Sequence, residues 1–153
     1  MHSDFSDLLS AFNAFGVEYL VVGAHALAAH GRIRATKDMD VFVRPSVANA
    51  ERVLQALADF GAPLHDLSVA DLAVPGLIFQ IGVPPIRIDV ITVIDGVSFD
   101  EAWSDRATAS LGGVAVAVLS RHHLIQNKKI AGRKQDLADV EWLESPDGQP
   151  PAC

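Results

Sequence analysis

The chain has 153 residues, a formal net charge of −7 and an apolar fraction of one half. This composition excludes a disordered protein and a protein coated in basic residues for general nucleic-acid binding. The one cysteine, Cys153, excludes a disulfide or a cysteine-based zinc site within one chain. Because no signal-like start and no membrane-length apolar run is visible, we expect a cytoplasmic protein without membrane contact. We expect one domain over residues 1–144 and a flexible tail over 145–153.

Taken in chain order, the apolar pattern alternates between helical and strand spacing. Helices are predicted over 4–14, 24–30, 46–60, 121–131 and 136–143, with one helical turn over 99–103. Strands are predicted over 19–22, 39–43 and 114–119, and a hairpin joins 77–81 to 86–93. Residues 62–75 give no clear pattern. Ser46 and Asp136 are expected to cap their helices, with Asp139 in the first turn of the last one. The alternation indicates an α/β (α+β) fold.

Three aspartates in apolar strands form the main candidate site. Asp38 and Asp40 open one strand two residues apart, so their carboxylates point to the same face. Asp89 is the one acid in the apolar run from Ile86 to Ile91. If the two strands are neighbours, the three carboxylates converge, and divalent cations would compensate their repulsion. Two metal ions in such a site suit in-line displacement at phosphorus.

A glycine turn precedes these carboxylates in the chain. Val22, Gly23 and Ala24 form a strand–glycine–helix step, which directs backbone N–H groups toward a possible phosphate. The same step is also compatible with an ordinary tight turn between a strand and a helix.

These features together resemble the DNA polymerase beta-type nucleotidyltransferase superfamily. The resemblance rests on the glycine turn, the stretch from Arg32 to Asp40 and the lone strand Asp89. The spacing from Gly23 to Asp38 and the segment 127–140 resemble the small prokaryotic branch akin to abortive-infection (toxin–antitoxin) nucleotidyltransferases. The resemblance implies a mixed β-sheet flanked by helices, and it covers residues 17–143.

The resemblance also implies roles for individual residues. Asp38, Asp40 and Asp89 would be catalytic and hold two Mg²⁺ or Mn²⁺ ions. The nucleotide would be bound by further residues of the same motifs, namely Gly23, Ala24, Thr36, Lys37 and Lys128. The reaction would move a nucleoside monophosphate (NMP) group from a nucleoside triphosphate (NTP) to a hydroxyl and release pyrophosphate. The acceptor hydroxyl could belong to a protein, a tRNA end or a small molecule.

Lys128 is also a candidate on its helix pattern alone. It shares a half-apolar face with Arg121 and Leu124, where a lysine either extends to solvent or faces an anion. Histidines at 25, 30, 122 and 123 do not have the spacing of a zinc site.

Two other functions stay open at this point. The related proteins commonly carry Gly-Gly or Gly-Ser at the turn, whereas this chain has Gly23-Ala24, without a hydroxyl for a phosphate. The chain could therefore be a weak or inactive nucleotide- or protein-binding module with a toxin or antitoxin partner. A metal-dependent phosphohydrolase would use the same carboxylates, but no additional residue to position water is evident.

Overall fold

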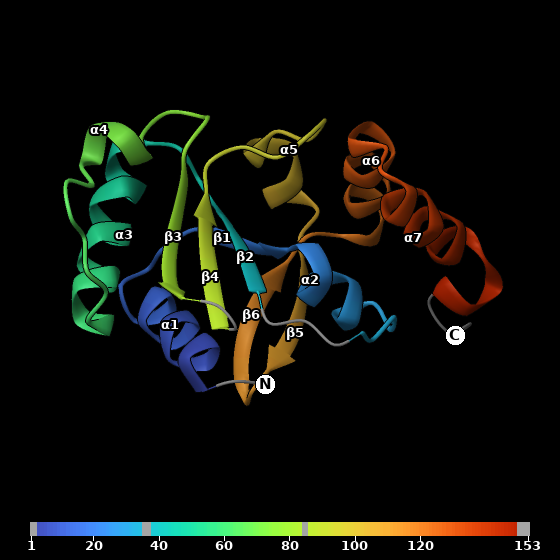
Figure 1. The fold of residues 1–153 in the computed structure, drawn as a ribbon, viewed down its shortest axis with the longest axis horizontal. Helices are drawn as coiled ribbons and strands as arrows, with labels where there is room; N and C mark the ends of the chain where they lie inside the picture. The colour runs from blue at the N-terminus through green and yellow to red at the C-terminus, as the bar shows by residue number, and fades with distance from the viewer. Residues whose placement is uncertain (1–2, 35–37, 84–85, 150–153) are drawn as a thin grey trace.

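The structure is a computed structural model that describes residues 3–34, 38–83 and 86–149 (Figure 1). Its strands are β1 (Tyr19–Val22), β2 (Asp38–Val43), β3 (Ile78–Val83), β4 (Ile86–Ile91), β5 (Ala107–Leu111) and β6 (Val114–Val118). Its helices are α1 (Ser3–Ala14), α2 (Gly23–Ala29), α3 (Val47–Phe60), α4 (Val69–Leu72), α5 (Phe99–Ser104), α6 (Arg121–Ala131) and α7 (Lys134–Glu144). A short 3₁₀ helix, η1 (Pro146–Gly148), follows α7.

The strands form one mixed sheet in the order β3-β4-β2-β1-β6-β5. The pairs β2–β4 and β1–β6 are parallel, and the pairs β1–β2, β3–β4 and β5–β6 are antiparallel. All four residues of β1 are buried, as expected for a central strand covered on both faces. The α/β fold with a mixed sheet flanked by helices is therefore confirmed.

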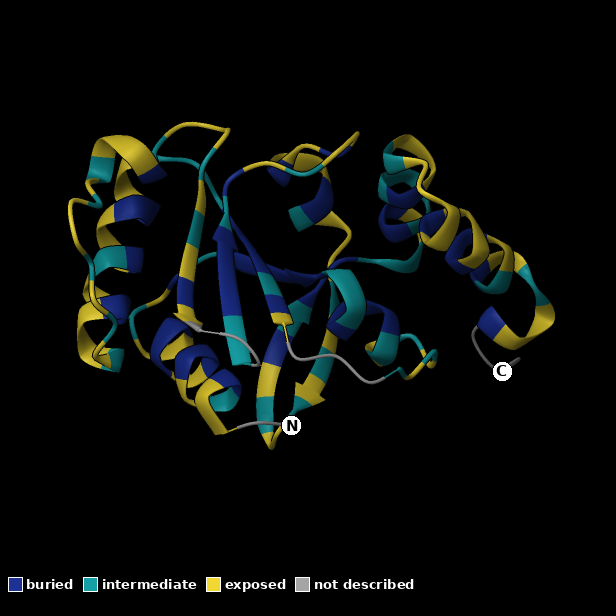
Figure 2. Cartoon of the chain, viewed as in Figure 1, coloured by how far each residue is buried: buried dark blue, intermediate teal, exposed yellow. Residues whose placement is uncertain are grey.

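The helices cover the sheet with apolar stripes. In α1, Phe5, Leu8, Leu9 and Phe12 are buried at helical spacing, and this helix packs against α3. Ser46 caps α3 as expected, because its side chain accepts a hydrogen bond from the backbone N–H of Asn49 at 3.2 Å. Helices α3 and α4 lie at one end of the view and α6 and α7 at the other (Figure 1), and buried residues face inward (Figure 2).

Within residues 1–144, two short elements were missed by the sequence prediction. The strand β5 lies at an edge of the sheet and consists mostly of small residues. Its half-buried and exposed positions alternate, but their side chains differ little in hydrophobicity, so the sequence shows no clear strand pattern. The four-residue helix α4 lies in the unclear segment 62–75, and Ser68 and Asp71 cap it reciprocally. The predicted hairpin is confirmed as the antiparallel pair β3–β4.

The beginning of the last helix was predicted wrongly. We expected Asp136 at the N-cap, but α7 begins at Lys134 and Arg133 is the N-cap. Asp136 accepts a hydrogen bond from the backbone N–H of Arg133 at 3.2 Å. Asp139 is fully buried, and its carboxylate pairs with cations from other parts of the chain instead of a helix end.

The flexible tail over 145–153 stays a prediction. In the described part, η1 lies against α7, and Arg121 Nε donates a hydrogen bond to the carbonyl oxygen of Gly148 at 3.0 Å. No helix of the described residues is long and apolar enough to cross a membrane.

Candidate active site

The site is built on two parallel neighbouring strands. The register of β2 and β4 places Asp40 directly beside Asp89 and Asp38 directly beside Arg87. Because residues two apart share a strand face, Asp38, Asp40, Arg87 and Asp89 project from the same face of the sheet. The expected neighbourhood of the two acidic strands is therefore confirmed.

Arg87 was not recognised in the sequence, although it stands only two residues before Asp89. Its Nη2 lies 3.4 Å from Asp38 Oδ2, and its Nε lies 3.1 Å from Asp89 Oδ1. The guanidinium thus provides a positive charge to carboxylates on both strands. Asp89 Oδ1 and Arg87 Nε are buried, and neither atom makes a hydrogen bond of good geometry. Both atoms can therefore still bind a ligand group.

Asp40 and Asp89 have raised pKa values. Burial, and after it the negative charges of Asp89 and Asp38, raise the pKa of Asp40 to about 6 against the opposing charge of Arg87. Burial also raises the pKa of Asp89, and Arg87 again opposes the shift. Crowded acids of this kind are typical of sites that hold a cation.

A pH-dependent stability follows for the metal-free protein. Asp40 binds its proton more tightly in the folded state than in the unfolded state, so its favourable contribution is lost as pH rises from about 4 through 6. Asp40→Asn removes this loss. We expect the free energy of unfolding of the variant to exceed that of the wild type by about 1–2 kcal/mol at pH 7, a value that is reduced because Asp40 is partly exposed. At pH 4 we expect a much smaller difference.

Urea denaturation at both pH values, with metal removed, measures this difference. A constant difference between variant and wild type from pH 4 to 7 would contradict the assigned environment of Asp40.

Gly23 lies against the carboxylate of Asp40, where there is no room for a side chain. Its φ of +66° belongs to the left-handed region, which favours glycine. A Cβ at this position would lie 2.7 Å from Asp40 Oδ2, closer than carbon and oxygen can approach. Val22 pairs with Asp40 across β1 and β2, which brings the turn to the carboxylate. Gly23 therefore permits the backbone and the acid to share one site.

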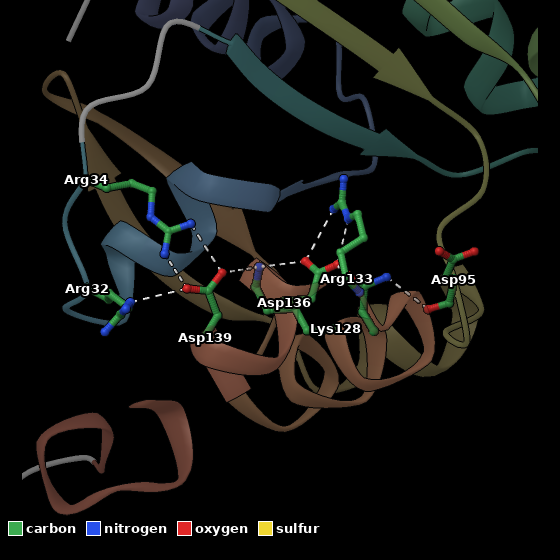
Figure 3. Close-up of polar contacts among 8 residues, drawn as sticks. Arg32, Arg34, Asp95, Lys128, Arg133, Asp136 and Asp139 are labelled. Carbon is green, nitrogen blue, oxygen red and sulfur yellow. Dashed lines mark hydrogen bonds and ion pairs between the residues drawn. The ribbon is translucent and has the colours of Figure 1, made fainter. Parts of the chain in front are cut away.

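Lys128 lies on the other side of the site in a charge cluster in which Lys128, Asp136 and Asp139 are buried (Figure 3). Its Nζ is 2.8 Å from Asp139 Oδ2 and 3.5 Å from Asp136 Oδ1. Asp139 also pairs with Arg34 and, at 3.2 Å, with Arg32. We call this set of residues the α6–α7 charge cluster: Arg32, Arg34, Lys128, Arg133, Asp136 and Asp139. It holds four cations and two carboxylates, and it lies beside Asp38 and Asp40, which line the same cavity.

Two cavities meet at Gly23 and Asp40. The first, of about 290 Å³, is also lined by Ala24, Asp38 and members of the α6–α7 charge cluster. The second, of about 350 Å³, is also lined by Asp89 and isoleucines of β3, β4 and the following loop. Lys128 lines both cavities. A larger, mainly apolar cavity lies elsewhere, at Phe42 and Phe99, and contains none of the candidate acids.

The structure therefore brings six of the expected site residues together: Gly23, Ala24, Asp38, Asp40, Asp89 and Lys128. Thr36 and Lys37 lie outside the described residues. The sequence analysis missed Arg87, Arg133 and Asp136, which line or contact the same site.

The donor set suits a hard divalent cation. Carboxylate oxygens are the ligands that Mg²⁺ and Mn²⁺ prefer, and Asp89 Oδ1 is buried without a hydrogen bond. In the described part of the chain, no three His, Cys, Asp or Glu side chains are close enough to enclose an ion as they stand. Asp38 and Asp89 are engaged with Arg87 instead. A bound metal would therefore compete with this guanidinium for the carboxylates.

Comparison with protein families identifies the class of this site. Residues 1–145 match the family described as "Nucleotidyl transferase of unknown function (DUF2204)". The chain belongs to this nucleotidyltransferase family. It is therefore an enzyme of the nucleotidyltransferase class, as the sequence resemblance implied. No curated protein matches the chain.

Solved structures share the fold at low sequence identity. The lincosamide antibiotic adenylyltransferase LnuA, solved with lincomycin bound, has a TM-score of 0.62 and 14% identity, over 95% of this chain and 97% of that chain. ANT(2")-Ia in complex with adenylyl-2"-tobramycin has a TM-score of 0.60 and 15% identity, over 91% of this chain and 84% of that chain. At these identities the likeness establishes the nucleotidyltransferase fold.

Proposed function

We propose that the enzyme transfers an NMP group from an NTP to a hydroxyl acceptor, with release of pyrophosphate. The observation that carries this proposal is the cluster of Asp38, Asp40 and Asp89 beside Gly23, at the junction of two cavities. A binding module would not need three acids on buried strands, because their repulsion destabilises the fold.

Each part of the site has a role in this reaction. Asp38, Asp40 and Asp89 would hold two divalent ions, Mg²⁺ or Mn²⁺, which would supply positive charge to the phosphates and to the acceptor hydroxyl. Gly23 and Ala24 place backbone N–H groups at the phosphates. Thr36 and Lys37, which lie outside the described residues, stay expected nucleotide-binding residues. Asp89 accepts the proton of the attacking hydroxyl.

The α6–α7 charge cluster binds the departing pyrophosphate in this proposal. Lys128 is not a free cation, because Asp136 and Asp139 neutralise part of its charge. Arg34 and Arg133 line the same cavity and leave the cluster with excess positive charge. A cluster that is prearranged in this way stabilises developing negative charge without moving.

Ala24 favours an alternative function, that of a weak or inactive binding module. It has no hydroxyl to bind a phosphate, so the chain could be a weak nucleotide-binding module that acts with a toxin or antitoxin partner. Restoring the hydroxyl tests this point: for the active enzyme we expect Ala24→Ser to strengthen NTP binding severalfold in calorimetry. An inactive module would show no transfer with either residue.

The test of the proposal is transfer of label from α-³²P NTPs in the presence of Mg²⁺ and cell extract. We expect labelled product and pyrophosphate from the wild type and neither from Asp38→Ala. Asp66→Asn is the matched control, because Asp66 is an exposed acid outside both cavities. Equal labelling by the wild type and Asp38→Ala, or release of phosphate in place of pyrophosphate, would overturn the proposal.

A further inference from the structure

We propose that Arg87 holds Asp38 and Asp89 until a metal-bound NTP displaces it, so that the site takes up metal and nucleotide together. This inference rests on the metal site of the transfer reaction proposed above and adds a residue that controls its loading. Arg87 stands on β4 in register with Asp38 of β2, and Asp89 follows two residues later on the same face. Its guanidinium therefore lies between acids of two different strands.

The guanidinium and a metal ion need the same oxygen atoms. Arg87 Nη2 lies 3.4 Å from Asp38 Oδ2 and donates a hydrogen bond to Asp89 Oδ2 at 3.4 Å. Arg87 Nε lies 3.1 Å from Asp89 Oδ1. A divalent cation binds such carboxylate oxygens directly, and two cations repel each other strongly at this range. An ion that takes these oxygens as ligands therefore has to displace the guanidinium.

The contacts of Arg87 are long for a pair of charged groups. Charge-assisted hydrogen bonds from nitrogen to a carboxylate typically measure about 2.7–2.9 Å. The pair of Lys128 and Asp139 in this protein measures 2.8 Å. Arg87 Nε and Asp89 Oδ1 are buried and close together, but they make no hydrogen bond. The guanidinium thus compensates the charge of the acids without being fixed by a tight bidentate pair.

The side chain of Arg87 also has room to move away. It is 30% exposed, and its neighbour across the pair β3–β4 is Gly82, which has no side chain to cover it. Gly82 is itself exposed, and a Cβ there would lie 2.7 Å from the carbonyl oxygen of Ile86. The sheet therefore leaves an open path over Gly82 by which the displaced guanidinium reaches solvent.

Displacement of Arg87 by a free metal ion gains few ligands. Mg²⁺ is usually bound by one or two carboxylates together with phosphate oxygens of a substrate, and rarely by protein ligands alone. A free ion would lose the competition for Asp38 and Asp89 more often than an ion that arrives with the phosphates of an NTP. Metal and NTP therefore bind cooperatively, and each strengthens the binding of the other by the same factor.

The same guanidinium stabilises the protein while no metal is bound. Asp38, Asp40 and Asp89 repel one another on neighbouring strands, and Arg87 offsets part of this repulsion. Replacing Arg87 by a neutral side chain therefore has two opposite effects: it destabilises the metal-free protein and it strengthens metal binding. A residue with a structural role alone would show only the first effect.

The first test is Mn²⁺ binding without nucleotide, measured by electron paramagnetic resonance. We expect the Kd of Arg87→Met for Mn²⁺ to be at least about tenfold lower than that of the wild type. Arg87→Lys keeps the charge but loses the planar fork that reaches both strands, so its Kd should be intermediate. Arg52→Met is the matched control, because Arg52 is an exposed residue of α3 outside both cavities. A Kd of Arg87→Met equal to or above that of the wild type overturns the inference.

The second test repeats the titration with a non-hydrolysable NTP analogue, after subtraction of the Mn²⁺ that the free analogue binds. We expect the analogue to lower the Kd for Mn²⁺ at least about tenfold in the wild type and less than about threefold in Arg87→Met. An equal effect in both proteins overturns the role of Arg87 alone. A wild type that binds no Mn²⁺ even with the analogue overturns the metal site of the proposed reaction as well.

Thermal unfolding provides a readout that does not depend on nucleotide. We expect metal-free Arg87→Met to have a lower Tm than the wild type, and Mn²⁺ to raise its Tm by more than it raises that of the wild type. A lower Tm without a larger response to Mn²⁺ would show that Arg87 is structural only. If metal-free Arg87→Met does not fold, Arg87→Lys decides the matter, and a Kd for Mn²⁺ equal to that of the wild type then overturns the inference.

Discussion

Asp139→Ala is expected to cost about 3–5 kcal/mol of folding free energy, a large share of the stability of a small domain. Asp139 is fully buried and accepts from Lys128 Nζ at 2.8 Å, and it also pairs with Arg34 and Arg32. Its removal leaves the ammonium of Lys128, which is itself 7% exposed, with Asp136 at 3.5 Å as its remaining carboxylate. Urea denaturation measures the loss.

Two controls separate this effect from ordinary loss of an ion pair. Glu144→Ala removes the exposed pair with Lys129, whose atoms lie 3.0 Å apart, and should cost less than about 1 kcal/mol. The double variant Lys128→Met with Asp139→Leu should recover part of the stability, because it removes the buried ammonium along with its partner. A cost below about 1 kcal/mol for Asp139→Ala would show that the α6–α7 charge cluster is not a structural centre.

Gly23→Ala is expected to lower transfer activity at least about 100-fold while the protein still folds. The new Cβ would lie 2.7 Å from Asp40 Oδ2, so either the turn or the carboxylate must move. A displacement of about 1 Å in a catalytic group is sufficient for a loss of this size. Labelled NTP transfer measures the activity, and thermal unfolding confirms that the variant is folded.

The matched control is Gly16→Ala. Gly16 has a similar φ of +68°, but a Cβ there would meet nothing within 4 Å. Both variants therefore carry the backbone cost of about 1–2 kcal/mol, and only Gly23→Ala disturbs the acid. Equal activity of the two variants would show that Gly23 serves the turn alone.

The carboxylates could be predicted because their positions follow from local rules. Strand alternation places Asp38 and Asp40 on one face, and Asp89 stands out as a lone acid in an apolar run. That the two strands are neighbours was a condition of the sequence analysis, and the register of β2 and β4 meets it by placing Asp40 beside Asp89.

The charge partners could not be predicted because they depend on tertiary packing. The local pattern of α7 makes Asp136 and Asp139 resemble helix-capping acids, whereas packing of α6 on α7 brings Lys128 to both. Arg87 was missed for a similar reason. Its partner Asp38 lies 49 positions away, and only the parallel register joins them.

The most direct test of the central claim is titration of Mn²⁺ into the protein with a non-hydrolysable NTP analogue, followed by electron paramagnetic resonance. If Asp38, Asp40 and Asp89 hold the metal, the wild type binds Mn²⁺, and Asp40→Asn binds it at least about tenfold more weakly. Asp66→Asn should bind Mn²⁺ as the wild type does. Equal Mn²⁺ binding by the wild type and Asp40→Asn, or no binding by the wild type at millimolar Mn²⁺, would contradict the assignment of these carboxylates as the metal site.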